Sequence, residues 1–337
     1  MSIARISLPE STSIDMVLPF VIQLDRFSEH DQLVVDLRSG AFFSPFTMLL
    51  LASKISELRR RSHRLQVIFN GWDNYPYLSH MGFFDMCDLH RGNAMGAAWG
   101  SEHYLPITKL NRHSLIEKET DRFEEMQDLL QRHVDNIATV LGRDISRKSP
   151  IFKILSYTIR EIFRNVFEHG DTDELYFCAQ YWPKSNKVEF AVSDFGIGVK
   201  QGLARNPNFR FDTDKQALEY SLLPSVSGRT HEPRRSENWF NSGYGLYMTN
   251  RLARNGGNFV IASGKSAICL TPKTKTNFQT SFNGTILRVS LNVEQIGDVQ
   301  QRLAEFRQDG AKLAAQITGS GNRPPSAMSM LLRRDYH

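Results

Sequence analysis

The stretch Glu161-Ile-Phe-Arg-Asn-Val-Phe-Glu-His-Gly170 decides how the rest of this sequence is interpreted. Apolar residues recur every three or four positions over residues 154–167, which predicts a helix with one buried face. Glu161, Asn165 and Glu168 share a second face. A carboxylate can polarise a water, and an amide oxygen can ligate Mg²⁺. Taken alone, however, this face is better interpreted as the solvated side of an amphipathic helix.

Two glycine-containing segments further along the chain change that interpretation. Asp194-Phe-Gly-Ile-Gly198 follows a predicted strand, and its glycines allow a sharp turn close to a planar ligand, where Asp194 can accept a hydrogen bond from an amine. Gly243-Tyr-Gly-Leu246 opens a predicted helix, whose first N–H groups would face an anion. Between them, residues 201–242 are largely irregular, and a stretch of this length is typical of a lid or of a solvated loop.

Composition narrows the class of protein. The chain has 337 residues, enough for two domains, with 41% hydrophobic and 23% charged residues, as in globular proteins. The net charge is +5, and the Lys and Arg residues are scattered along the chain, so nucleic-acid binding is not indicated. The three cysteines are far apart, which favours a reducing, cytoplasmic location. No stretch approaches the ~20 apolar residues of a membrane helix, so we expect no membrane association.

The first third of the chain predicts a strand–helix–strand unit. Strands are expected over residues 33–37 and 65–69, and such a crossover implies parallel pairing. Ser44-Pro45 opens the helix between them, with Ser44 as the N-cap. Further helices are predicted over residues 117–141, 214–223 and 293–317, and further strands over residues 102–108, 175–182, 187–193, 259–262 and 284–291.

This N-terminal order resembles the STAS-type domain, the small α/β fold of anti-sigma-factor antagonists. Ser44 stands where that family carries a phosphorylatable serine, but the family's Asp-Ser-(Ser/Thr)-Gly loop is replaced here by Phe42-Phe-Ser-Pro-Phe46. The resemblance therefore implies a docking surface, and an N-cap remains the preferred interpretation of Ser44.

Residues 148–292 resemble the GHKL ATPases, the group of gyrase B, heat-shock chaperones, histidine kinases and mismatch-repair ATPases. The resemblance is carried by the order of the Glu-x-x-x-Asn helix, Asp-x-Gly-x-Gly, a lid, Gly-x-Gly-Leu and a late Gly-Thr strand. It is closest to the anti-sigma-factor serine kinases, whose Glu-x-x-x-Asn-x-x-x-His-Gly box is matched by Glu161, Asn165, His169 and Gly170. No P-loop motif occurs.

The resemblance implies ATP and Mg²⁺ as cofactors and gives each matching residue a role. Asn165 would ligate Mg²⁺, Glu161 would be the general base, and Asp194 would bind the adenine amine. Phosphoryl transfer depends mostly on positioning and charge neutralisation, for which few groups suffice. The other implied contacts are Gly196 and Gly198 beside adenine, Thr285 through a water, Gly243, Gly245 and Leu246 at the phosphates, and Arg229 with Ser227 in the lid.

We therefore expect a STAS-like α/β domain over residues 1–110, a helical connector over 111–147, a GHKL (Bergerat-type) α/β sandwich with a mixed sheet over 148–292, and a helix with a flexible tail over 293–337. The expected function is a Mg-ATP-binding signalling protein that phosphorylates a Ser or Thr on a regulatory protein partner or switches conformation with nucleotide. Two alternatives remain: an ATPase driven into a homodimer by nucleotide, and a non-catalytic ATP-binding module. A histidine kinase is disfavoured because no suitable phosphoacceptor helix is visible.

Overall fold

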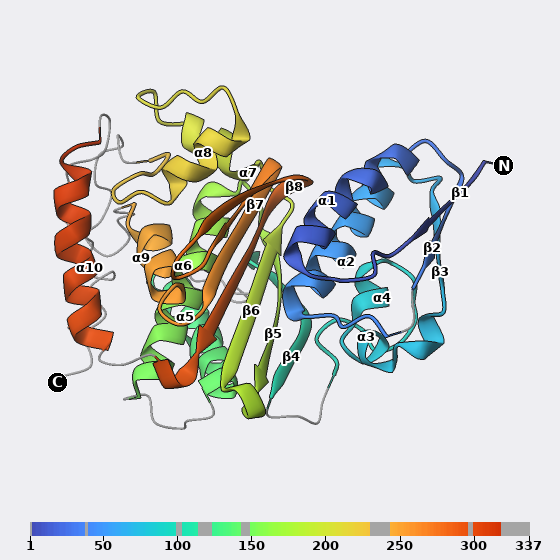
Figure 1. Ribbon diagram of the computed structural model, residues 1–337, viewed down its shortest axis with the longest axis horizontal. Coiled ribbons are helices and arrows are strands. Elements are labelled where there is room, and N and C mark those ends of the chain that lie inside the picture. Colours follow the sequence, from blue (N-terminus) through green and yellow to red (C-terminus); the bar gives the residue numbers. More distant parts are fainter. Residues whose placement is uncertain are drawn as a thin grey trace.

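Two β-sheets and the helices between and beside them build this mixed α/β protein. The computed structural model describes residues 2–37, 40–98, 103–113, 123–142, 149–229, 243–295 and 299–317. Figure 1 shows the layers in order: a three-stranded sheet, a helical layer, a five-stranded sheet, a second helical layer and an outermost C-terminal helix.

The three-stranded sheet contains β1 (Ile3–Ser7), β2 (Gln32–Asp36) and β3 (Gln66–Asn70), and β2 pairs in parallel with both neighbours. The predicted strand–helix–strand unit and its parallel pairing are confirmed. The crossovers are α1 (Ile14–Leu24) and α2 (Pro45–Arg61), and two short helices follow, α3 (Pro76–His80) and α4 (Phe83–Met86). The Ser44 hydroxyl accepts a hydrogen bond from the Thr47 N–H at 3.4 Å, so Ser44 is the predicted N-cap.

The five-stranded sheet has the order β4-β5-β6-β8-β7. Each neighbouring pair is antiparallel, which corrects the expected mixed sheet: β5 and β6, like β7 and β8, are consecutive strands joined by short turns, and such hairpins can only be antiparallel. The edge strand β4 pairs with β5, so it belongs to this sheet although it precedes the connector. The strands are β4 (Tyr104–Asn111), β5 (Glu174–Trp182), β6 (Lys187–Asp194), β7 (Asn258–Leu270) and β8 (Lys275–Asn292).

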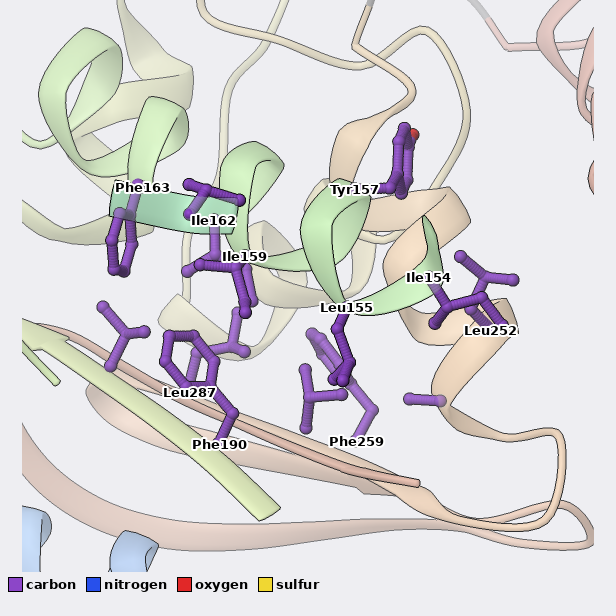
Figure 2. Close-up of a cluster of buried hydrophobic side chains, with 14 of the residues drawn as sticks. Ile154, Leu155, Tyr157, Ile159, Ile162, Phe163, Phe190, Leu252, Phe259 and Leu287 are labelled. Carbon is purple, nitrogen blue, oxygen red and sulfur yellow. The ribbon is translucent and has the colours of Figure 1, made fainter. Parts of the chain in front are cut away.

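Helices α5 (Phe123–Gly142), α6 (Pro150–His169) and α9 (Gly245–Ala253) cover one face of this sheet. The predicted apolar stripe of α6 faces the strands: in Figure 2, Leu155 and Ile159 point toward the sheet residues Phe259 and Leu287. All four side chains are buried, and burial of one such side chain contributes about 1.5–3 kcal/mol. This packing fixes which face of α6 remains for Asn165.

Helices α1 and α2 cover the opposite face of the same sheet (Figure 1), so one hydrophobic core joins the two units. It contains Ile55 of α2 together with Cys178 and Ile286 of the five-stranded sheet. Polar contacts also cross the junction, since the Ser53 and Ser193 hydroxyls lie 2.9 Å apart. The sheet that carries Asp194 is therefore buried on both sides.

The remaining elements flank the start of α9. Helix α7 (Gly198–Ala204) extends into the stretch 201–242, which was expected to be largely irregular, and helix α8 (Asp214–Ser221) confirms the helix predicted over residues 214–223. Residues 230–242 of this stretch are outside the described part of the chain. Helix α10 (Val299–Ala314) packs on α9. The predicted tail, residues 318–337, is also outside the described residues. Within the described ranges, no helix is long and apolar enough to cross a membrane.

Candidate functional site

A cavity with about 820 Å³ of empty space, open solvent included, lies beside α6, the end of β6, the middle of β8, α7 and the start of α9. Eight of the residues predicted to contact a ligand line it: Asn165, Asp194, Gly198, Ser227, Gly243, Gly245, Leu246 and Thr285. The motifs that are separated in the sequence therefore meet in one place.

Most of the remaining cavity wall is apolar. None of these wall residues was predicted as a site residue, because an apolar side chain carries no polar signal that distinguishes a ligand-binding position from a core position. The side chains that form it are Ile162, Val166, Val192, Val199, Leu203, Val226, Ile261 and Leu287. A wall of this kind suits a flat, weakly polar ligand group.

Asp194 is the carboxylate of the cavity. It ends β6, is 2% exposed, and accepts a hydrogen bond from the Gly196 N–H at 2.8 Å. Burial raises its pKa to about 7, although hydrogen bonds from the Gly196 and Thr285 backbones oppose this rise. A carboxyl group held in an apolar cavity with a perturbed pKa is a candidate ligand-binding group.

Glycines let the Asp194 turn approach the end of α6. A Cβ at Gly196 would fall 1.9 Å from the Gly170 carbonyl oxygen, which accepts a hydrogen bond from the Ile197 N–H at 2.8 Å. Gly198 has φ +75°, a conformation that favours glycine. Gly196 therefore allows the close approach of the turn to Gly170 but does not line the cavity, whereas Gly198 does line it.

Two glycines, one on each side of Tyr244, shape the start of α9. Gly243 has φ +72°, and a Cβ there would fall 2.6 Å from the Val226 nitrogen. Tyr244, at the N-cap, makes no side-chain cap hydrogen bond within the described residues. The N-terminus of a helix carries a partial positive charge and free N–H groups, which makes this end of the cavity suitable for an anion.

Glu161 and Asn165 are separated by one helical turn but differ in access. Asn165 lines the cavity, whereas Glu161 is fully buried and does not. Glu161 Oε2 lies 3.3 Å from Nη2 of Arg164, and a Cβ at Gly245 would fall 2.5 Å from the same oxygen. Arg164 also pairs with Glu168 at 3.2 Å. Sequence reasoning missed Arg164, although its spacing of three and four from the two glutamates is that of helical ion pairs.

Part of the predicted lid forms one side of the cavity. Ser227 and Gly228 line it, and the Ser227 hydroxyl accepts a hydrogen bond from the Arg229 N–H at 3.2 Å. His169 Nε2 lies 3.4 Å from the same hydroxyl, and burial together with the charges of Arg229, Arg164 and Arg205 lowers the His169 pKa to about 3, so the ring is neutral. Arg229 itself does not line the cavity.

The residues around the cavity set limits on a metal ion. Across the described ranges, no group of three or more His, Cys, Asp or Glu side chains is arranged to hold one. Mg²⁺ commonly takes few protein ligands and completes its shell with phosphates and water, so Asn165 fits such a site without a protein cage.

No protein-family model matches the sequence, and a search of curated proteins finds no match.

Proposed function

We propose that this protein is a Mg-ATP-binding signalling switch of the GHKL type, akin to the anti-sigma-factor serine kinases, with a STAS-like N-terminal unit. The observation that carries the proposal is the meeting of Asn165, Asp194, Gly243 and Thr285 around one cavity. These residues come from four segments that were singled out separately in the sequence.

The chemistry of the cavity fits the parts of ATP. Asp194 would accept a hydrogen bond from the adenine amine, and the apolar wall would hold the ring. The first N–H groups of α9 would bind phosphate oxygens. Asn165 would ligate Mg²⁺, which supplies charge neutralisation at the phosphates when bound.

The switch would act on a protein partner in the cytoplasm. The three cysteines are free, and two of them are buried, which is consistent with a reducing compartment. A regulatory protein would dock on the STAS-like unit or near the lid and present a Ser or Thr hydroxyl, for which Glu161 is the candidate base.

A non-catalytic ATP-binding module is the second candidate, and one observation favours it. Glu161 is paired with Arg164 at 3.3 Å and does not line the cavity, so its carboxylate is not placed to contact a water or hydroxyl there. In that case nucleotide would change how the protein docks, and no phosphoryl group would move.

Incubation with γ-labelled ATP and Mg²⁺ tests these candidates. Label on protein supports a kinase, label in free phosphate supports an ATPase, and ATP binding without label transfer supports the module. The ATPase candidate also predicts a nucleotide-dependent homodimer, measurable by sedimentation. The Asp194→Asn variant should bind ATP at least tenfold more weakly, since about 1.4 kcal/mol corresponds to tenfold. If the wild-type protein shows no ATP binding by calorimetry, the proposal fails.

The same experiment examines Ser44. Because Ser44 is the N-cap of α2, we expect Ser44→Ala to lower the free energy of unfolding by about 1 kcal/mol and to leave any protein-bound label unchanged. Loss of the label in this variant would instead identify Ser44 as the phosphoacceptor.

A further inference from the structure

A glycine lies in the middle of the C-terminal helix α10, where it faces the turn that opens α9. Gly310 of α10 is buried, and a Cβ there would fall 2.9 Å from Tyr244 Cε1 and 2.8 Å from Tyr247 Cε1. Glycine inside a helix is less favourable than alanine. The close approach of two tyrosine rings is the physical reason for a glycine at this position.

Tyr244 links this contact to the cavity. It stands between Gly243 and Gly245, both of which line the cavity, and its side chain is 1% exposed. The Tyr244 carbonyl also accepts the hydrogen bond from the Met248 N–H at 2.9 Å, in the first turn of α9. The ring position of Tyr244 and the backbone of the turn are thus fixed together.

Other contacts hold α10 in place. The Tyr247 hydroxyl donates to the Phe306 carbonyl at 3.2 Å, and Arg251 pairs with Asp309 at 3.6 Å. At the far end of α10, Ile317 packs against a small cluster that includes Leu203 and Val226. Both of these residues line the cavity, so α10 and the residues after it reach two of its walls.

We propose that Gly310 is a positioning residue for the anion-binding turn, acting through Tyr244, so that α10 sets the affinity for the phosphate end of the ligand. The proposal rests on the proposed function in taking that ligand to be a nucleoside triphosphate. The affinity for adenosine, which lacks the phosphates, should not change, because the group proposed to bind adenine, Asp194, belongs to β6 and not to α9.

The test compares Gly310→Ala with Gln308→Ala, an exposed position on the same helix. Both changes raise helix propensity, so a shared effect would come from the helix itself. Calorimetry gives the Kd of Mg-ATP and of adenosine, and hydrogen exchange of the Met248 amide in the ligand-free protein reports on the turn. Phe306→Ala is the second variant, because it weakens the docking of α10 by removing packing rather than adding an atom.

We expect Gly310→Ala and Phe306→Ala to raise the Kd of Mg-ATP about fivefold or more, to leave that of adenosine within about twofold, and to speed exchange at Met248, with Gln308→Ala matching wild type. Equal loss of ATP and adenosine binding, or no difference between the position-310 and position-308 variants, overturns the proposal. If the wild type binds neither compound, the proposed function fails. In that case hydrogen exchange of the Met248 amide tests the role of Gly310 by itself. If exchange in Gly310→Ala is the same as in wild type, the proposed role of Gly310 is overturned. If it is faster, the control of the turn by Gly310 is supported.

Discussion

The Arg164 guanidinium lies 3.3 Å from the Glu161 carboxylate, and both side chains are almost completely buried in α6. The same guanidinium lies 3.2 Å from Glu168, so one buried cation serves two buried carboxylates. Removal of one partner of such a group leaves an uncompensated charge in a region of low polarity.

We therefore expect Arg164→Met to lower the free energy of unfolding by about 3–5 kcal/mol. Urea unfolding followed by circular dichroism measures the change. Arg164→Lys retains the charge and should lose less than half as much. Equal losses in the two variants would show that the fit of the arginine side chain, rather than its charge, supports the fold.

Asp194 should make stability depend on pH. Its pKa is 3.8 in the reference state and about 7 in the folded protein, so the folded protein holds this proton more tightly. The free energy of unfolding should then fall as pH rises from about 4 to 7, by on the order of 4 kcal/mol. Asp194→Asn carries no such charge and should be more stable than wild type above pH 7 but not at pH 4. A difference between the two proteins that does not vary with pH would contradict this account.

Gly196 should tolerate no side chain. A Cβ added at this position would fall 1.9 Å from the Gly170 carbonyl oxygen, which is a backbone atom and has little room to move. We expect Gly196→Ala to destabilise the protein by about 2 kcal/mol or more. Gly142→Ala is the matched control because its nearest neighbour would be 3.7 Å away, an ordinary contact. Thermal unfolding of the two variants decides the matter.

Lys54 is a buried cation at the junction of the two units. Its Nζ lies 2.7 Å from Asp25 and 3.3 Å from both Glu57 and the Ser281 hydroxyl of β8. Lys54→Met should cost about 3–5 kcal/mol and speed hydrogen exchange in both sheets, because one core spans them. Lys184→Met, at an exposed site, should change neither quantity. Faster exchange confined to the N-terminal sheet would mean that the units unfold separately.

The parts predicted from sequence are those with local signals. The Asp194 turn and the Gly243 turn are short motifs whose glycines have a conformational reason to be there, and the α6 stripe has a clear helical period. The parallel unit of β2, α2 and β3 follows from two short apolar runs and from the helix between them, which Ser44 caps. These features need no knowledge of what packs against them.

The parts not predicted depend on distant contacts. Helix α1 was not predicted, because it contains Pro19 and a proline inside a segment normally argues against a helix. Strands β7 and β8 are longer than predicted: Ser263, Gly264 and Lys265 interrupt the apolar pattern of β7 at a bulge, and the first half of β8 is largely polar. Asp194 and Asn165 were recognised, but the pairing of Glu161 with Arg164 and the approach of Gly310 to Tyr244 are set by packing that a short window of sequence does not contain.

The position of β4 restricts how this chain could have been assembled from parts. The chain completes its parallel sheet, supplies the outer strand of the antiparallel sheet, and only then enters the helices that lead to β5. A cut after residue 111 would therefore strip an edge strand from β5 and uncover the sheet face that α1 and α2 protect. Gene rearrangements that exchange the N-terminal unit as a separate cassette should be tolerated only if they leave β4 behind and bring a replacement cover for that face.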